Sequence, residues 1–155
     1  MIFDTHCHLN HEDLYNRLDE VLESAKKIGV EKILVVGWDK TSSLKAIELA
    51  EQYEFIYAAI GFHPTELEGV TEEDFEELMS YVDHPKVVAI GEIGLDYHWV
   101  KDPGLRNLQK QWFIKQINFA NLHQKPISVH NREAFEDCLN ILKEHPPIYS
   151  GVMHC

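Results

Sequence analysis

The sequence has a deficit of basic residues and no long apolar segment. Its 155 residues include 14 lysines and arginines against 26 aspartates and glutamates, a formal net charge of −12. This balance argues against a basic nucleic-acid coat protein or a polybasic membrane-binding protein, because both need a positively charged surface. It leaves open an enzyme that meets phosphate through bound metal ions. No apolar run approaches the ~20 residues that cross a bilayer and no secretion-signal pattern is present, so we expect no membrane partner.

Cysteines are also few, which excludes two small-protein frameworks. There are three, Cys7, Cys138 and Cys155, with no Cys-x-x-Cys pair. A disulfide-stabilised chain or a zinc ribbon would need paired cysteines. We therefore expect a soluble protein of a reducing compartment, the cytoplasm. The length fits a single domain, residues 1–155, with a substantial core.

Short apolar runs alternate with segments of helical period along the whole chain. Six runs are expected to be strands: Ile2–Thr5, Lys32–Gly37, Phe55–Gly61, Val87–Gly91, Pro126–His130 and Tyr149–His154. Most are continuously apolar, as is typical of parallel strands covered on both faces. The alternation with helices predicts an α/β fold, a parallel sheet wrapped by helices.

Capping residues predict several helix boundaries. A first helix is expected over Leu14–Ile28, where the apolar residues form one stripe. Thr71 followed by Asp74 resembles a capping box, and Asp102 ahead of a proline is a typical helix start. Asn131 is expected to cap the last helix.

Two architectures match this alternation. A nucleotide-binding doubly wound sheet would usually carry Gly-x-Gly-x-x-Gly after its first strand, whereas Thr5-His6-Cys7-His8 stands there without a glycine. A (β/α)8 barrel has roughly 250 residues, or about 31 for each strand and helix. We therefore predict the N-terminal portion of a (β/α)8 barrel of the TIM type, incomplete at about six strands and five helices, with two unpaired sheet edges.

The strongest chemical signal is the His-x-His pattern at the end of the first expected strand. Because side chains alternate along a strand, His6 and His8 point to one side and Cys7 to the other. Active sites of (β/α)8 barrels lie at this carboxyl end of the strands. Two imidazoles there form half of a metal site, although an isolated His-x-His is more often structural.

Three later strands each end in another metal-binding side chain. Glu92 follows an apolar strand, where a carboxylate is costly unless it is paired or bound to a metal. His130 and His154 close the fifth and sixth strands in the same way. A separate structural role for each of these side chains would not explain why all of them lie at the same end of their strands. We therefore predict a metal centre made of His6, His8, Glu92, His130 and His154.

Four histidines and a carboxylate are too many ligands for one zinc ion with an open position. They match two divalent ions sharing a carboxylate, which about 3.5–4 Å apart clamp the attacking and leaving oxygens of a displacement. The chemistry indicated is hydrolysis by an activated water. The identity of the ions stays open among Mg, Mn and Zn.

At these residues the sequence resembles the TatD family of metal-dependent deoxyribonucleases, within the amidohydrolase-like barrels. The resemblance extends over six segments in order: Phe3–Leu9, Gly61–Pro64, Gly91–Tyr97, Gln109–Gln116, Val129–Ala134 and Gly151–Cys155. It implies that Glu92 is the catalytic carboxylate that bridges two ions. His6 and His8 would hold the first ion, and His130 and His154 the second. It also implies hydrolysis of phosphodiester bonds, with DNA as the substrate.

The family also places an aspartate after its last barrel strand, as a ligand of the first ion and an acceptor of the water proton. These 155 residues stop before any such position. We therefore expect little hydrolytic activity from this chain alone, and weakened binding of the ion at His6 and His8.

Weaker candidates surround these ligands. His63, after the third strand, is expected to contact substrate or to be a plain loop histidine. Arg132 offers a planar group suited to phosphate, or is a surface residue. Asp96 would orient a ligand or turn its loop. Aromatic residues that follow strands, and are candidates for stacking on bases, are Trp38, Tyr97 and Trp99. We assign no function to His11, His84, His98, His123 and His145.

The acidic composition bears on the substrate. At −12, binding to duplex DNA should be weak, since two divalent ions offset only four charges, so we expect action on DNA ends or single strands. Two alternatives stay open: a hydrolase of another ester or amide, such as an aminoacyl-tRNA, on the same metal frame, or an inactive fragment or interaction module. The sequence does not predict the oligomeric state.

Overall fold

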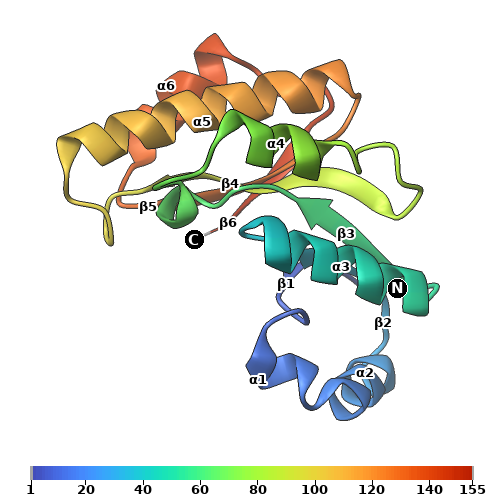
Figure 1. The fold of residues 1–155 in the computed structure, drawn as a ribbon. Coiled ribbons are helices and arrows are strands. Elements are labelled where there is room, and N and C mark those ends of the chain that lie inside the picture. Colours follow the sequence, from blue (N-terminus) through green and yellow to red (C-terminus); the bar gives the residue numbers. More distant parts are fainter. Residues whose placement is uncertain (1, 155) are drawn as a thin grey trace.

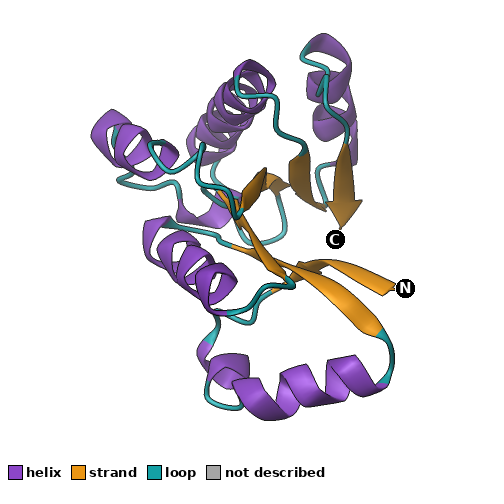
Figure 2. Cartoon of the chain, turned by 90° about the vertical axis from the view of Figure 1, so that its right-hand side faces the viewer, coloured by secondary structure: helices purple, strands orange, loops and turns teal. Residues whose placement is uncertain are grey.

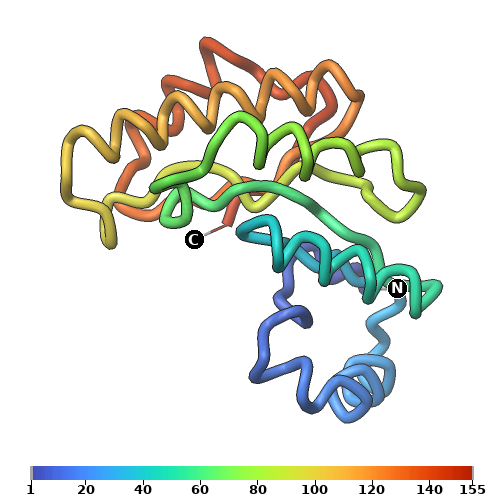
Figure 3. The backbone as a smooth tube through the Cα atoms, in the orientation of Figure 1, coloured from blue at the N-terminus to red at the C-terminus, as the bar shows by residue number. Residues whose placement is uncertain are grey.

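All six expected strands are present in the computed structural model, which describes residues 2–154. They are β1 (Ile2–Cys7), β2 (Val30–Val36), β3 (Ile56–Ile60), β4 (Val87–Asp96), β5 (Ile127–Arg132) and β6 (Gly151–His154). Neighbouring strands are parallel and their spatial order is the chain order. The colours in Figure 3 follow one another across the sheet accordingly. A doubly wound sheet would reverse its strand order, so this topology confirms the predicted barrel-type fold.

The helices cover one face of a curved sheet (Figure 1). They are α1 (Glu12–Tyr15), α2 (Leu18–Lys27), α3 (Lys40–Gln52), α4 (Glu72–Met79), α5 (Pro103–Leu122) and α6 (Phe135–Glu144), with a 3-10 turn at η1 (Pro64–Glu66). Figure 2 shows them as an arc around the strands, with both ends of the chain at the open side. Among these helices none is both long and apolar enough to span a bilayer.

Most predicted helix starts are confirmed. Thr71 and Asp74 form a reciprocal capping box at α4, and the Leu105 backbone N–H donates to Asp102 at 2.9 Å at the start of α5. The first expected helix is divided into α1 and α2, because Arg17 has φ −127° and ψ 27°, outside the helical range.

The predicted cap at Asn131 is wrong. Asn131 belongs to β5, where it pairs with Leu95 of β4. The hydrogen-bond ladder between these two strands continues to the pair Asp96 and Arg132, so α6 begins only at Phe135. The extension of both strands beyond the expected ends carries their last side chains to the rim where the predicted ligands lie.

The core fills the space between the sheet and the helices. It includes Val35, Ile60 and Ile93 from the strands and Leu49, Leu78 and Phe113 from the helices. In the described residues β1 and β6 do not pair with each other, and each leaves one edge of the sheet open, as predicted.

Candidate metal centre

The carboxyl ends of β1, β4, β5 and β6 bring the five predicted ligands together, with the four histidines around the carboxylate of Glu92. Glu92 Oε2 lies 3.5 Å from Nε2 of His6 and 3.5 Å from Nε2 of His8. Glu92 Oε1 lies 3.0 Å from Nδ1 of His130 and 2.5 Å from Nε2 of His154. Each oxygen of this carboxylate therefore faces one pair of the four predicted histidine ligands.

Glycines on either side of Glu92 make this approach possible. A Cβ at Gly91 would lie 2.6 Å from Ser128 Cβ, and a Cβ at Gly94 would overlap the His130 carbonyl oxygen. Gly94 also has a φ of +144°, which side chains on L residues rarely adopt. The close contact of β4 with β5 at these two positions holds Glu92 beside His130.

Hydrogen bonds orient His8 and His6 toward Glu92. The His8 Nδ1–H donates to the Val36 carbonyl at 3.1 Å. Because a carbonyl only accepts, His8 Nε2 carries the lone pair that a cation needs. His6 Nδ1 is 3.0 Å from Ser128 Oγ, and the Nε2 atoms of His6 and His8 are 3.3 Å apart. The ligand atoms of His6, His8 and Glu92 all lie within 4.8 Å of one another, which suits one cation.

His130 is held between two carboxylates. Its Nδ1 faces Glu92, and its Nε2–H donates to Asp96 Oδ2 at 2.8 Å. Burial would lower the pKa of His130, but the hydrogen bonds to Glu92 and Asp96 outweigh burial and raise it. A buried carboxylate on the far nitrogen of an imidazole is the arrangement found around metal-binding histidines. Of the two roles that the sequence left open for Asp96, the structure favours the first, orienting a predicted ligand.

Glu92 is buried and ionised. Its exposed fraction is 3%. Burial alone would raise its pKa, but hydrogen bonds with His130, His154 and His6 outweigh burial, and the pKa lies below its ordinary value. A buried negative charge surrounded by imidazoles is an environment that favours cations.

His63 also reaches this cluster, but with the opposite hydrogen-bonding role. Its Nε2 is 3.7 Å from Glu92 Oε1. Its Nδ1 accepts from the Thr65 backbone N–H at 3.2 Å, so in the neutral ring Nε2 carries the proton. Burial lowers the pKa of His63 to about 4, which keeps the ring neutral near pH 7. His63, Glu92 and His130 lie close enough to hold a cation, yet His63 presents a donor there rather than a lone pair.

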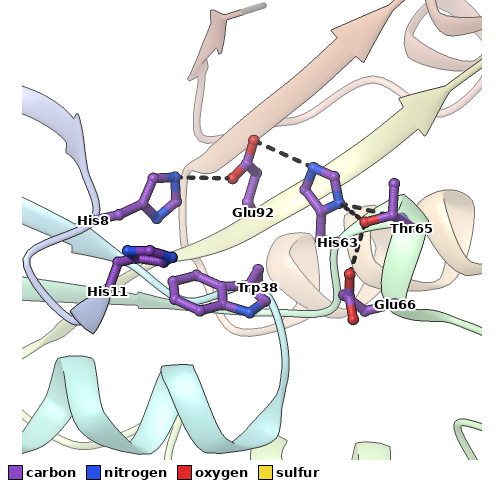
Figure 4. Close-up of a pocket in the computed structure, with 7 residues that line it drawn as sticks. All are labelled: His8, His11, Trp38, His63, Thr65, Glu66 and Glu92. Carbon is purple, nitrogen blue, oxygen red and sulfur yellow. Dashed lines mark hydrogen bonds and ion pairs between the residues drawn. The ribbon is translucent and has the colours of Figure 1, made fainter. Parts of the chain in front are cut away.

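A cavity of about 340 Å³ opens beside the cluster (Figure 4). It is lined by His8, His11, Trp38, His63, Thr65, Glu66 and Glu92. Figure 4 shows His8 and His63 on either side of Glu92, with His11 and Trp38 facing them. The sequence interpretation assigned no function to His11 and did not single out Thr65 or Glu66. A signal that these three residues share in the sequence is their position shortly after β1 or β3, at the carboxyl end of the strands.

Arg132 lies outside this cluster. No hydrogen bond or ion pair joins it to Glu92 or to the predicted ligands among residues 2–154. Its guanidinium instead sits over the ring of Trp99, 5.6 Å from the ring centroid.

Comparison with known proteins identifies the chain's relatives. A sequence model described as TatD related DNase matches residues 3–155. The chain belongs to this family. Among TatD relatives, the uncharacterized metal-dependent hydrolase YabD of Bacillus subtilis is 49% identical over 156 residues, which cover 100% of this chain and 60% of YabD. Human deoxyribonuclease TATDN3 is 32% identical over 92% of this chain and 56% of its own length.

A solved TatD structure has the same fold. The crystal structure of the TatD homologue YjjV from Escherichia coli superposes with a TM-score of 0.91 at 32% identity, covering 99% of this chain and 59% of YjjV. The chain therefore spans about 60% of the length of the relatives it matches.

Proposed function

We propose that this chain carries the two-ion site of a metal-dependent phosphodiesterase that acts on DNA. The observation that carries the proposal is Glu92, a buried carboxylate whose two oxygens face different pairs of histidines. A single ion would not require the two oxygens of Glu92 to face different pairs of histidines. The human relative TATDN3 is named a deoxyribonuclease, which supports DNA as the substrate.

The donor set fits divalent cations. His6, His8 and Glu92 Oε2 would hold one ion, and Glu92 Oε1, His130 and His154 the other. When bound, such ions supply an acidified water and neutralise charge on phosphate oxygens. Nitrogen and carboxylate ligands of this kind accept Zn, Mn or Mg.

The remaining side chains position the ligands and the substrate. Asp96 keeps His130 turned so that Nδ1 faces Glu92. The Nε2–H of His63 would donate to a non-bridging phosphate oxygen, and its low pKa leaves it uncharged in that role. Trp38 and His11 line the opposite side of the cavity, where a sugar or base would lie.

The experiment is a Mn²⁺ titration of the wild-type chain and of Glu92→Gln by isothermal calorimetry. The wild type should bind two ions. The variant should lose more than about tenfold in affinity, because losing even an outer partner of a ligand costs 10–100-fold. Glu77→Gln, which removes the same charge from an exposed position on α4, is the matched control.

Cleavage is measured with end-labelled single-stranded DNA, duplex DNA and an aminoacyl ester in parallel. Cleavage by this chain should be slow and metal-dependent, and faster on the single strand than on the duplex. Unchanged two-ion binding by Glu92→Gln would contradict the site. Turnover of the ester without any cleavage of DNA would contradict the substrate.

A further inference from the structure

We propose that Trp99 and Arg132 form a stacking subsite for an unpaired nucleobase next to the metal centre. This inference rests on the proposed function and specifies how a single strand is selected. Trp99 follows β4, at the same rim of the sheet as Glu92, and its side chain is 67% exposed. Tryptophan is highly buried on average, so an indole this exposed at the rim of a site points to a ligand.

The Trp99 loop is tied to the metal centre through one carboxylate. Asp96 Oδ1 accepts from the Trp99 backbone N–H at 2.8 Å, while Asp96 Oδ2 accepts from His130 Nε2 at 2.8 Å. Asp96 is buried, with 1% of its surface exposed. Asp96 thus fixes the position of the Trp99 backbone relative to the His130 ring. A base stacked on Trp99 would therefore lie at a defined distance from the ions.

Basic side chains gather around the indole, although the chain is acidic overall. The guanidinium of Arg132 lies 5.6 Å from the Trp99 ring centroid, and the His98 ring packs edge-on at 4.7 Å. His98 and Lys101 share Glu133 as their anionic partner, at 2.7 and 3.5 Å. Among the described residues no carboxylate lies within ion-pair distance of Arg132, so its charge stays available for a phosphate.

An exposed indole with an adjacent guanidinium matches a nucleotide of a single strand. The indole face stacks on a base of any sequence, and arginine contacts the phosphate that follows. In a duplex the bases are already stacked and paired, so this contact would require unpairing. The register supports the placement, because Arg132 pairs with Asp96 and stands two residues beyond His130.

The test measures binding of a fluorescein-labelled oligothymidine with phosphorothioate linkages by anisotropy in Mn²⁺. Trp99→Ala should weaken binding about tenfold, within the range seen for loss of one base–aromatic stack, and Trp99→Phe should retain most of it. Arg132→Gln should weaken binding and reduce its salt dependence by about one ion, as expected for a lost phosphate contact. Tyr81→Ala, a change at an exposed aromatic residue between α4 and the amino end of β4, is the control and should bind like the wild type.

An abasic scan makes the result independent of folding of the variants. A single abasic nucleotide, moved along the oligonucleotide, should weaken wild-type binding at one position and leave Trp99→Ala unaffected there. Equal binding at every abasic position, or wild-type affinity in Trp99→Ala, overturns the stacking subsite alone. If the wild type takes up Mn²⁺ and hydrolyses bis(p-nitrophenyl) phosphate but binds no oligonucleotide, the subsite and the DNA substrate are both wrong while the metal centre stands.

Discussion

Hydrogen-bond direction separates the histidines at this site into two kinds. His8 gives its Nδ1 proton to the Val36 carbonyl and turns Nε2 toward Glu92. His130 faces Asp96 with Nε2 and Glu92 with Nδ1, where a cation would take the place of the Nδ1 proton. His63 does the reverse, since the Thr65 backbone N–H occupies its Nδ1. Residues that look alike in the sequence are thus prepared for different partners, a cation for His8 and His130 and an anionic oxygen for His63.

This difference yields a prediction for His63→Ala. The variant should still bind two Mn²⁺ ions with an affinity within about threefold of the wild type, because His63 Nε2 lies 3.7 Å from Glu92 Oε1, beyond hydrogen-bond distance, and no ligand is removed. Its affinity for a short single-stranded oligonucleotide should fall about tenfold or more, as expected for one lost hydrogen bond to a charged group. His130→Ala, measured beside it, should lose one ion. Loss of an ion in His63→Ala would make His63 a ligand and contradict the assignment.

At the scale of the element, α5 clamps the strand ends that carry the site. Gln116 Oε1 accepts from the Phe62 N–H at 2.9 Å, and its Nε2 donates to the Phe62 carbonyl at 3.1 Å. Gln109 does the same for Asp96, at 3.0 and 3.2 Å. Both glutamines are 1% exposed. The backbone N–H and C=O groups of Phe62 and of Asp96 therefore obtain these hydrogen bonds from side chains of a helix.

Gln116→Ala should lower the free energy of unfolding by about 2–4 kcal/mol, because it leaves two buried backbone groups of Phe62 without partners. Gln111→Ala, the same change at an exposed position of the same helix, should stay within about 0.5 kcal/mol. Urea unfolding followed by circular dichroism provides both values. Equal losses of unfolding free energy in the two variants would mean that the hydrogen bonds between the Gln116 amide and Phe62 do not stabilise the fold.

For the molecule as a whole, the open sheet edges are the dominant surface feature. β1 and β6 end the sheet, and Phe3 and Val152 are 46% and 37% exposed there. Both line an apolar cavity of about 350 Å³ on the inner face of the sheet, together with Leu34 and Ala89. Strand edges with unpaired backbone groups and exposed apolar side chains promote association.

The 155-residue chain should therefore self-associate with increasing concentration and bind the dye ANS. Phe3→Lys combined with Val152→Lys should reduce both, since charge at a sheet edge opposes strand pairing. Ile28→Lys, a change at an exposed apolar residue between α2 and β2, serves as the control. Size-exclusion chromatography with light scattering distinguishes the outcomes. A wild-type chain that stays monomeric at all concentrations would show that these edges are not adhesive.

Local pattern was enough for the strands and for the candidate ligands. Short, mostly apolar runs predicted the six strands, and the inner ones are apolar because a parallel strand covered on both faces must be so throughout. His6, His8, Glu92, His130 and His154 could be selected since each follows or ends such a run, and parallel strands present those ends at one rim. Strand ends were less predictable: pairing with β5 carries β4 on to Asp96, and no local feature of the sequence marks that limit.

The sequence by itself determined the order of strands and helices, the side of each strand that a ligand faces, and the family resemblance, because these depend on neighbours within a few residues. Only the tertiary structure decided which oxygen of Glu92 meets which histidine, that His63 offers a proton, that Asp96 links Trp99 to His130, and that His11 lines the cavity. Those relations join residues from different strands and loops. They depend on sheet curvature and strand register, which hydrogen bonding and packing across the whole fold establish.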